Sequence, residues 1–322
     1  MPLAFLFPGQ NSRYPEMLET LVTRDRANGD LLERASDVLG RDLGAHFRAD
    51  NPEIFAHNRD VQIGVFLANH MHWQTLERAG VQAEYSAGLS LGEYNHLVHI
   101  GALGFEEALR VLTVRGEAYE NAPRGMMAAV FPVPAEEVQA LVEAQGQGEK
   151  LAIGMYNTPQ QCVLSGERGA VEAASRQIEA DHYAQAAVVD ERLPMHSPLF
   201  QGVGDVLRPA LQAVQWRKPS KPYLSNVKGN FVSDPSPAEF AELLAAHPWR
   251  PVRWRDCVET LARAAEGMGF VEVGPKSVLT RFFAKRWLNP RRYSTDSEED
   301  FRRTVKEIKE FSGGFSGTAN AD

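Results

Sequence analysis

Apolar residues change their spacing along the chain in a way that predicts alternating strands and helices. Leu3 to Phe7 is a short apolar run that ends at Pro8-Gly9, as a buried strand followed by a sharp turn does. From Val61 to Arg78 the apolar residues recur at helical spacing. A strand over 85–87 then leads into the glycine-rich turn 88–92, and the helical pattern resumes after it. This alternation predicts an α/β fold.

Between residues 126 and 195 the order of expected elements is strand, helix, two strands, helix, strand. The strands fall at 126–131, 151–155, 161–165 and 186–189, and the helices at 134–145 and 167–180. This βαββαβ order is typical of a ferredoxin-like unit. We expect 126–195 to be such a subdomain, inserted in a larger α/β domain made of 1–125 and 196–310. The glycine-rich end, 311–322, is expected to be a disordered tail.

Composition places the chain among soluble globular proteins, with 43% hydrophobic and 24% charged residues in a length of 322. No apolar stretch reaches the ~18 residues of a membrane span, and the first residues lack the features of a secretion signal. We therefore expect a cytoplasmic protein without a membrane partner. Cys162 and Cys257 stand far apart with no CxxC neighbour, which favours reduced thiols over a disulfide or a metal site.

The formal net charge of −8 argues against binding of nucleic acid. Residues 276–310 nevertheless hold ten Lys or Arg against six Asp or Glu, so this segment carries +4 and the rest of the chain −12. A basic segment on an acidic protein suits a small anionic ligand or partner. The alternative is a solvated helix face of mixed charge.

The turn Gly88-Leu89-Ser90-Leu91-Gly92 matches G-x-S-x-G, in which a serine hydroxyl is exposed on a sharp turn between a strand and a helix. A serine at a helix amino terminus is also close to backbone N–H groups that favour a developing negative charge. The alternative is a glycine-rich turn with a helix-capping serine. With the nucleophile reading, the predicted fold is an α/β-hydrolase-like domain with a short parallel sheet that carries the ferredoxin-like subdomain.

A serine nucleophile needs a base, and nine histidines are available. His196 is the favoured candidate, because it follows the last expected strand of the inserted subdomain and precedes a helix. The remaining candidates, which we expect to be surface or packing residues, include His57, His72, His96 and His99.

Nine short motifs occur along the chain in a characteristic order. They are Phe7-Pro8-Gly9-Gln10, Gly88-Leu89-Ser90-Leu91-Gly92-Glu93-Tyr94, Arg115-Gly116, Met126-Met127-Ala128-Ala129, Asn157-Thr158-Pro159, Met195-His196-Ser197-Pro198, Ser225-Asn226-Val227, Pro251-Val252-Arg253-Trp254 and Glu272-Val273-Gly274-Pro275. In order and approximate spacing they resemble the malonyl-CoA:acyl carrier protein transacylases and the acyltransferases of polyketide synthases. The resemblance extends from about Pro2 to Arg286.

This resemblance implies a ping-pong acyl transfer without a cofactor, in which Ser90 is the nucleophile and His196 the base. The donor is a CoA or carrier-protein thioester, and the acceptor is the phosphopantetheine thiol of an acyl carrier protein in fatty-acid or polyketide biosynthesis. The backbone N–H groups of Gln10 and Leu91 correspond to the oxyanion hole of the family. A main-chain carbonyl within 246–248, rather than an aspartate, is expected to orient the histidine.

The family resemblance also implies an acyl pocket, in which this chain departs from the usual pattern. Arg115 matches an arginine that pairs with the carboxylate of a malonyl group, and Gln62 and Asn157 match polar pocket residues. Leu89 replaces the usual histidine before the nucleophile, and Met195 replaces a small or aromatic residue. The arginine favours a malonyl-type group, while the two apolar residues favour something bulkier. A helix-surface position for Arg115 is the alternative.

Three other functions stay open: carrier-to-carrier transfer of a larger acyl or aminoacyl group, hydrolysis of acyl thioesters, and a non-catalytic scaffold that binds carrier proteins. Carrier proteins of this family's pathways are typically acidic, so basic residues near the late motifs are candidates for docking. They are Arg250, Arg253, Lys276, Arg281, Lys285, Arg286, Arg291 and Arg292.

Overall fold

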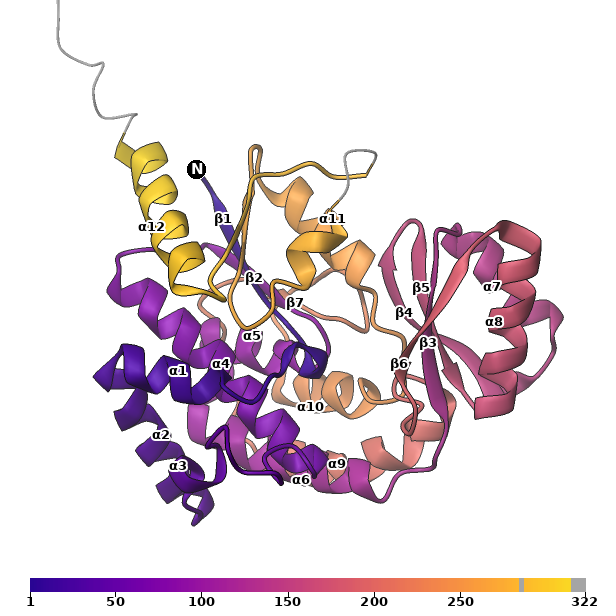
Figure 1. Cartoon of the computed structure of the whole chain (residues 1–322), viewed down its shortest axis with the longest axis horizontal. Helices are drawn as coiled ribbons and strands as arrows, with labels where there is room; N and C mark the ends of the chain where they lie inside the picture. Colours follow the sequence, from indigo (N-terminus) through magenta and orange to yellow (C-terminus); the bar gives the residue numbers. More distant parts are fainter. Residues whose placement is uncertain (284–286, 314–322) are drawn as a thin grey trace, which may run out of the picture. The chain divides into compact units, whose positions relative to one another are not determined.

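The computed structural model describes residues 1–283 and 287–313, which form two compact units (Figure 1). One unit consists of Met1–Ile100 and Leu261–Asp322, as far as the latter is described, and the other of Gly101–Thr260. The second boundary falls within helix α11 (Trp254–Ala264). Each unit has its own principal sheet.

The first unit is built on a parallel sheet with the strand order β10-β9-β1-β2. These strands are β1 (Leu3–Phe7), β2 (Tyr85–Gly88), β9 (Gly269–Glu272) and β10 (Arg292–Ser294). Strand β1 lies between two neighbours and all its residues are buried, which explains its unbroken apolar sequence. The predicted strand over 3–7 and the predicted α/β fold with a parallel sheet are confirmed.

Helices surround this sheet in the sequence order of the first unit. They are η1 (Gln10–Ser12), α1 (Met17–Arg24), α2 (Arg26–Leu39), α3 (Leu43–His46), α4 (Asn58–Arg78), α5 (Gly92–His99), η4 (Leu279–Phe282) and α12 (Glu298–Gly313). Trp73 and Leu76 of α4 pack with Phe5 and Phe7 of β1 in one core cluster. None of the helices among the described residues is long and apolar enough to cross a membrane.

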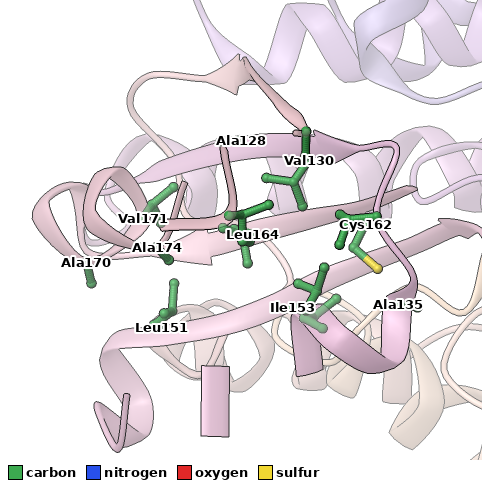
Figure 2. Packing of buried hydrophobic residues seen from close by; sticks show 14 of the residues in the cluster. Ala128, Val130, Ala135, Leu151, Ile153, Cys162, Leu164, Ala170, Val171 and Ala174 are labelled. Carbon is green, nitrogen blue, oxygen red and sulfur yellow. The ribbon is translucent and has the colours of Figure 1, made fainter. Parts of the chain in front are cut away.

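The second unit contains the predicted βαββαβ run. Its elements are β3 (Met126–Phe131), α7 (Ala135–Ala144), η2 (Gly148–Lys150), β4 (Leu151–Thr158), β5 (Gln161–Gly166), α8 (Arg168–His182) and β6 (Gln185–Asp190). The four strands form an antiparallel sheet in the order β4-β5-β3-β6. Figure 2 shows how Val130, Ile153 and Leu164 of this sheet pack with Val171 of α8. This order of elements and strands is ferredoxin-like.

The chain enters and leaves this ferredoxin-like unit at one place. Strands β3 and β6 are neighbours, with Met127 paired to Asp190. Just outside them, the Gly125 N–H donates to the Arg192 carbonyl over 2.9 Å. A β-carbon at Gly125 would lie 2.3 Å from the Gly166 carbonyl oxygen, so only glycine fits at this junction.

The rest of the second unit consists of α6 (Phe105–Glu120), η3 (Pro198–Phe200), α9 (Gln201–Gln212), β7 (Tyr223–Leu224), β8 (Phe231–Val232), α10 (Pro237–Ala246) and most of α11. Helix α9 packs against both α6 and α10. Segments 101–125 and 196–260 therefore belong to the same compact unit as the ferredoxin-like sheet, whereas the sequence-based division assigned them to the larger domain.

Helix α12 continues to Gly313, so 311–313 are helical where a disordered tail was expected, and 314–322 lie outside the described residues. Its arginines Arg302 and Arg303 pair with Glu298 and Asp300, and Lys306 lies 3.9 Å from Glu310. This part of the basic segment thus has the mixed-charge helix face of the alternative interpretation.

Candidate active site

Ser90 lies on the sharp turn between β2, which ends at Gly88, and α5, which begins at Gly92. Its φ of +51° is in the left-handed region, which L-residues seldom adopt. Hydrogen bonds from Gly92 N to the Leu89 carbonyl (3.0 Å) and from Glu93 N to the Ser90 carbonyl (2.9 Å) hold the turn. This is the geometry that the G-x-S-x-G motif predicts for a nucleophile.

Both glycines of the motif are required by packing. A β-carbon at Gly88 would lie 1.9 Å from the carbonyl carbon of Gly92, and one at Gly92 would lie 2.1 Å from the Phe7 carbonyl oxygen. The alternative of a capping serine finds no support in this turn, because the N-cap residue of α5 is Leu91 and no side chain caps that end. The turn is therefore built around an exposed hydroxyl rather than around a helix cap.

The two candidate oxyanion residues follow neighbouring strand ends. Gln10 begins η1 directly after β1, and Leu91 lies one turn beyond the end of β2, which pairs with β1. A β-carbon at Gly9 would lie 2.9 Å from the Leu89 carbonyl oxygen, so the loop that carries Gln10 packs directly on the serine turn. Ligands of parallel sheets commonly bind at this carboxyl edge.

A buried pair of asparagines, absent from the sequence-based predictions, supports this edge. The Asn69 side chain donates to the Pro8 carbonyl and to Asn95 Oδ1, both over 3.0 Å, and Asn95 Nδ2 donates to the Phe66 carbonyl over 3.0 Å. Helices α4 and α5 are thereby tied to the loop after β1. Gln62, one of the predicted pocket residues, is also fully buried on α4.

His196 belongs to the second unit, and backbone carbonyls fix its orientation. Its Nδ1 lies 2.9 Å from the His247 carbonyl oxygen, and its backbone N–H donates to the Pro248 carbonyl over 2.7 Å. Because a carbonyl only accepts, Nδ1 carries the proton and Nε2 is left as the acceptor. The prediction of an orienting carbonyl within 246–248 is confirmed at His247.

The surroundings of His196 keep it neutral. Its side chain is buried, and burial together with the nearby Arg115 guanidinium lowers its pKa to about 4, although the carbonyls of His247 and Arg250 act in the opposite direction. A neutral imidazole with a free Nε2 lone pair is the form that a general base needs near pH 7.

Arg115 is 1% exposed on α6, so the helix-surface alternative is wrong. Its guanidinium carbon lies 4.6 Å from the centre of the Tyr119 ring. The His247 ring, which the sequence-based prediction missed, lies 5.3 Å from the His196 ring, and burial, His196 and Arg115 hold its pKa well below the usual range. The unit thus brings a buried cation, the candidate base and a second neutral imidazole together.

The remaining pocket candidates are buried or nearly so. Met195 and Leu89 are 5% and 9% exposed, and the Met195 carbonyl accepts from Ser165 Oγ over 2.6 Å. Asn157 lies at the end of β4 and its Nδ2 donates to Gln161 Oε1 over 3.3 Å, within the β4–β5 turn. A β-carbon at Gly154 would lie 3.4 Å from the β-carbon of His196, so β4 runs beside the candidate base.

The predicted docking residues have different surroundings. Arg253 pairs with Asp256 over 2.6 Å, Arg250 stacks on Trp249, and Arg291 lies over the Phe311 ring. Arg281 and Arg292 line a cavity of about 280 Å³ with Arg303. Lys276 lies just before this cavity with a φ of +72°. Lys285 and Arg286 lie outside the described residues.

Metal chemistry has no candidate site in the part of the chain that is described, since no three His, Cys, Asp or Glu side chains are grouped to hold an ion there. Cys162 and Cys257 are free and buried. Burial raises the pKa of Cys162 to about 12, so its thiol is a packing group rather than a nucleophile.

Comparison with known proteins gives a consistent result. The model of the acyl transferase domain family matches residues 4–292. A malonyl CoA-acyl carrier protein transacylase of Bacillus subtilis is 27% identical over 313 residues, which cover 96% of this chain and 98% of the relative.

Solved structures agree with this match. The crystal structure of a malonyl CoA-acyl carrier protein transacylase from Clostridium perfringens has a TM-score of 0.90 at 26% identity, covering 97% of this chain and 98% of that one. A malonyl-transacylase in complex with its holo type II PKS acyl-carrier protein has a TM-score of 0.87 at 28% identity, with coverage of 95% and 100%. With the serine turn, the oriented histidine and a family match over most of its length, this chain belongs to the acyl transferase domain family.

Proposed function

We propose that this acyltransferase moves a malonyl group from CoA, through an ester on Ser90, to the phosphopantetheine thiol of an acyl carrier protein in fatty-acid or polyketide synthesis. The observation that supports malonyl most directly is the buried Arg115 guanidinium beside the candidate base. A guanidinium pairs bidentately with a carboxylate, and the malonyl group is an acyl group with a free carboxylate.

The proposed chemistry runs in two halves. In the first, Ser90 Oγ attacks the thioester carbonyl while Nε2 of His196 accepts its proton, and the carbon–sulfur bond then breaks as the thiolate takes that proton back. In the second, the carrier thiol gives its proton to Nε2 and attacks the ester, and Ser90 is released protonated. Each half returns His196 to its neutral form, and the reaction needs no cofactor beyond the thioesters themselves.

Backbone donors are proposed to stabilise both tetrahedral intermediates. The N–H groups of Gln10 and Leu91, at the ends of paired strands, are the candidates for the oxyanion hole. The carbonyl of His247 would stabilise the imidazolium that forms transiently on His196, since its hydrogen bond with Nδ1 strengthens when the ring is charged.

Acyl choice is proposed to follow from one charged and several neutral residues. Arg115 would hold the carboxylate, with Gln62 and Asn157 as polar neighbours. Leu89 and Met195 would form an apolar wall that leaves room for a substituted malonyl group. The basic residues near the late motifs are proposed to attract an acidic carrier, and the cytoplasmic location stays a prediction from the sequence.

The decisive experiment is intact-protein mass spectrometry after incubation with malonyl-CoA, acetyl-CoA and a long-chain acyl thioester. We expect wild type to gain one malonyl mass, Ser90→Ala to gain none and His196→Ala to acylate slower by orders of magnitude. Loading of the long chain in preference to malonyl would replace this proposal by transfer of a larger acyl group. Steady release of free acid with the carrier present would point to a hydrolase, and an unmodified Ser90 with every thioester would point to a scaffold.

A further inference from the structure

The segment 247–250 has an inner side that holds the candidate base. The carbonyls of His247 and Pro248 accept hydrogen bonds from His196, and the Arg250 carbonyl also faces its ring. The segment begins at the end of α10 and is itself fixed, because the N–H groups of Trp249 and Arg250 both donate to the Ala246 carbonyl, over 3.1 and 2.9 Å. Any side chain on the outer side of this segment is therefore held at a fixed distance from His196.

The outer side carries a cation stacked on an indole ring. The guanidinium carbon of Arg250 lies 4.2 Å from the centre of the Trp249 ring. Trp249 is anchored on α9, where a β-carbon at Gly204 would lie 3.0 Å from the indole Cδ1 and 3.1 Å from Nε1. Since the ring lies against a bare glycine, Arg250 rests on a support that does not move freely, while its own side chain is exposed.

Arg250 differs from its neighbours in having no acid beside it. Arg253 pairs with Asp256, and Arg255 pairs with Asp256 and with Glu136. Among the residues that the structure describes, no carboxylate forms an ion pair with Arg250 and no acceptor binds its guanidinium. A positioned, exposed guanidinium is suited to bind an anion that arrives with a ligand.

We propose that Arg250, supported by Trp249, binds the phosphate that joins the pantetheine arm to CoA or to the carrier protein. The inference rests on the proposed function. Arg115, which is buried, suits the carboxylate at the acyl end, whereas an exposed cation suits a group farther along the substrate.

The length of the pantetheine arm agrees with this assignment. Twelve bonds separate the thioester sulfur from the phosphate ester oxygen, which equals about four extended residues or ~14 Å. The sulfur must come close to His196 to react, and the Arg250 backbone already contacts that ring, so a phosphate ~14 Å along the arm lies within range of a long arginine side chain. Because CoA and the carrier share this phosphate, one residue would serve both halves of the reaction.

The test uses four malonyl thioesters that differ by one group each: pantetheine, 4′-phosphopantetheine, dephospho-CoA and CoA. We expect Arg250→Gln to raise KM by about five- to tenfold for the three that carry the pantetheine phosphate and to leave KM for the pantetheine thioester unchanged. Trp249→Leu should give the same pattern with a smaller, about threefold, effect. Arg208→Gln is the matched control, because Arg208 is an arginine of α9 already paired with Glu242 and Asp205.

Two results would overturn the inference. Equal losses for pantetheine and phosphopantetheine thioesters would mean that Arg250 acts on His196 and not on phosphate. A loss confined to CoA would assign Arg250 to the phosphate on the ribose instead. Failure of the proposed function gives a different result, since no thioester would then malonylate Ser90 in wild type, whereas failure of this inference leaves malonylation intact and only the KM pattern changed.

Discussion

Buried neutral histidines should make this protein sensitive to mild acid. His72 on α4 is 2% exposed, and burial, with a smaller effect of Arg24, lowers its pKa to about 3, while burial lowers the pKa of His96 on α5 to about 3. A histidine in the unfolded chain titrates near 6.5, so below that pH the unfolded state binds protons that the folded state refuses. Stability is therefore complete above about pH 7 and is lost as the pH falls from 6.5 towards 3.

The size of the effect follows from these pKa values. Between pH 7 and pH 5 each of the two groups should lower the free energy of unfolding by about 1.9 kcal/mol, from 1.36 kcal/mol per pH unit below the unfolded pKa. Together they account for about 4 kcal/mol, a large part of the 5–15 kcal/mol typical of a folded protein. His72→Leu, which removes one titrating ring, should retain about 1.9 kcal/mol more of its pH 7 stability at pH 5 than wild type does.

The assay is urea unfolding at pH 7 and pH 5, followed by the fluorescence of the tryptophans, among which Trp73 is adjacent to His72. His57→Leu serves as the control, because His57 is exposed and its substitution should leave the pH dependence as in wild type. The reasoning fails if wild type and His72→Leu lose equal stability between the two pH values.

Three further outcomes test the site. Arg115→Ala should slow malonyl loading by about 100-fold and change acetyl loading only a few-fold, because one carboxylate loses its partner; equal losses would contradict the pairing. With its pKa near 4, His196 should give an acylation rate, measured by rapid quench, that is flat from about pH 5.5 to 8, and an inflection near 6.5 would show an ordinary histidine. Gly92→Ala should cost about 3 kcal/mol or more in urea unfolding, since its β-carbon would meet the Phe7 carbonyl at 2.1 Å, whereas Gly202→Ala on open helix surface should not destabilise.

The sequence predicts best the elements whose pattern reflects burial on both sides. The strands 3–7 and 126–131 are found with the predicted limits, because each is a continuous apolar run flanked by turn residues. Strands β8 and β10 were missed, since two or three residues carry no period and their pairing depends on neighbours remote in sequence, as Arg292 pairs with Phe270. Helix α12 was missed because its charged residues were read as a basic segment.

The site shows the same division between local and long-range information. The serine turn is a local motif, so Ser90 and its two glycines could be placed from sequence alone. The carbonyl that orients His196 could be limited to three residues, but the choice of His247 depends on backbone geometry 51 residues away. The ring of His247 and the support of Trp249 had no signal in the sequence, because each acquires its meaning only from what packs against it.

The paired ends of the ferredoxin-like unit have a consequence for how this chain could change in evolution. Gly125 and Arg192 are joined by one hydrogen bond, so everything between them hangs from a single point of the backbone. A segment whose ends already meet can be exchanged for another of similar ends with little disturbance of the chain on either side, as in domain insertion. Because β4 and the residues that contact His196 come from this segment, such an exchange would replace one wall beside the base in a single genetic step, leaving the serine turn untouched.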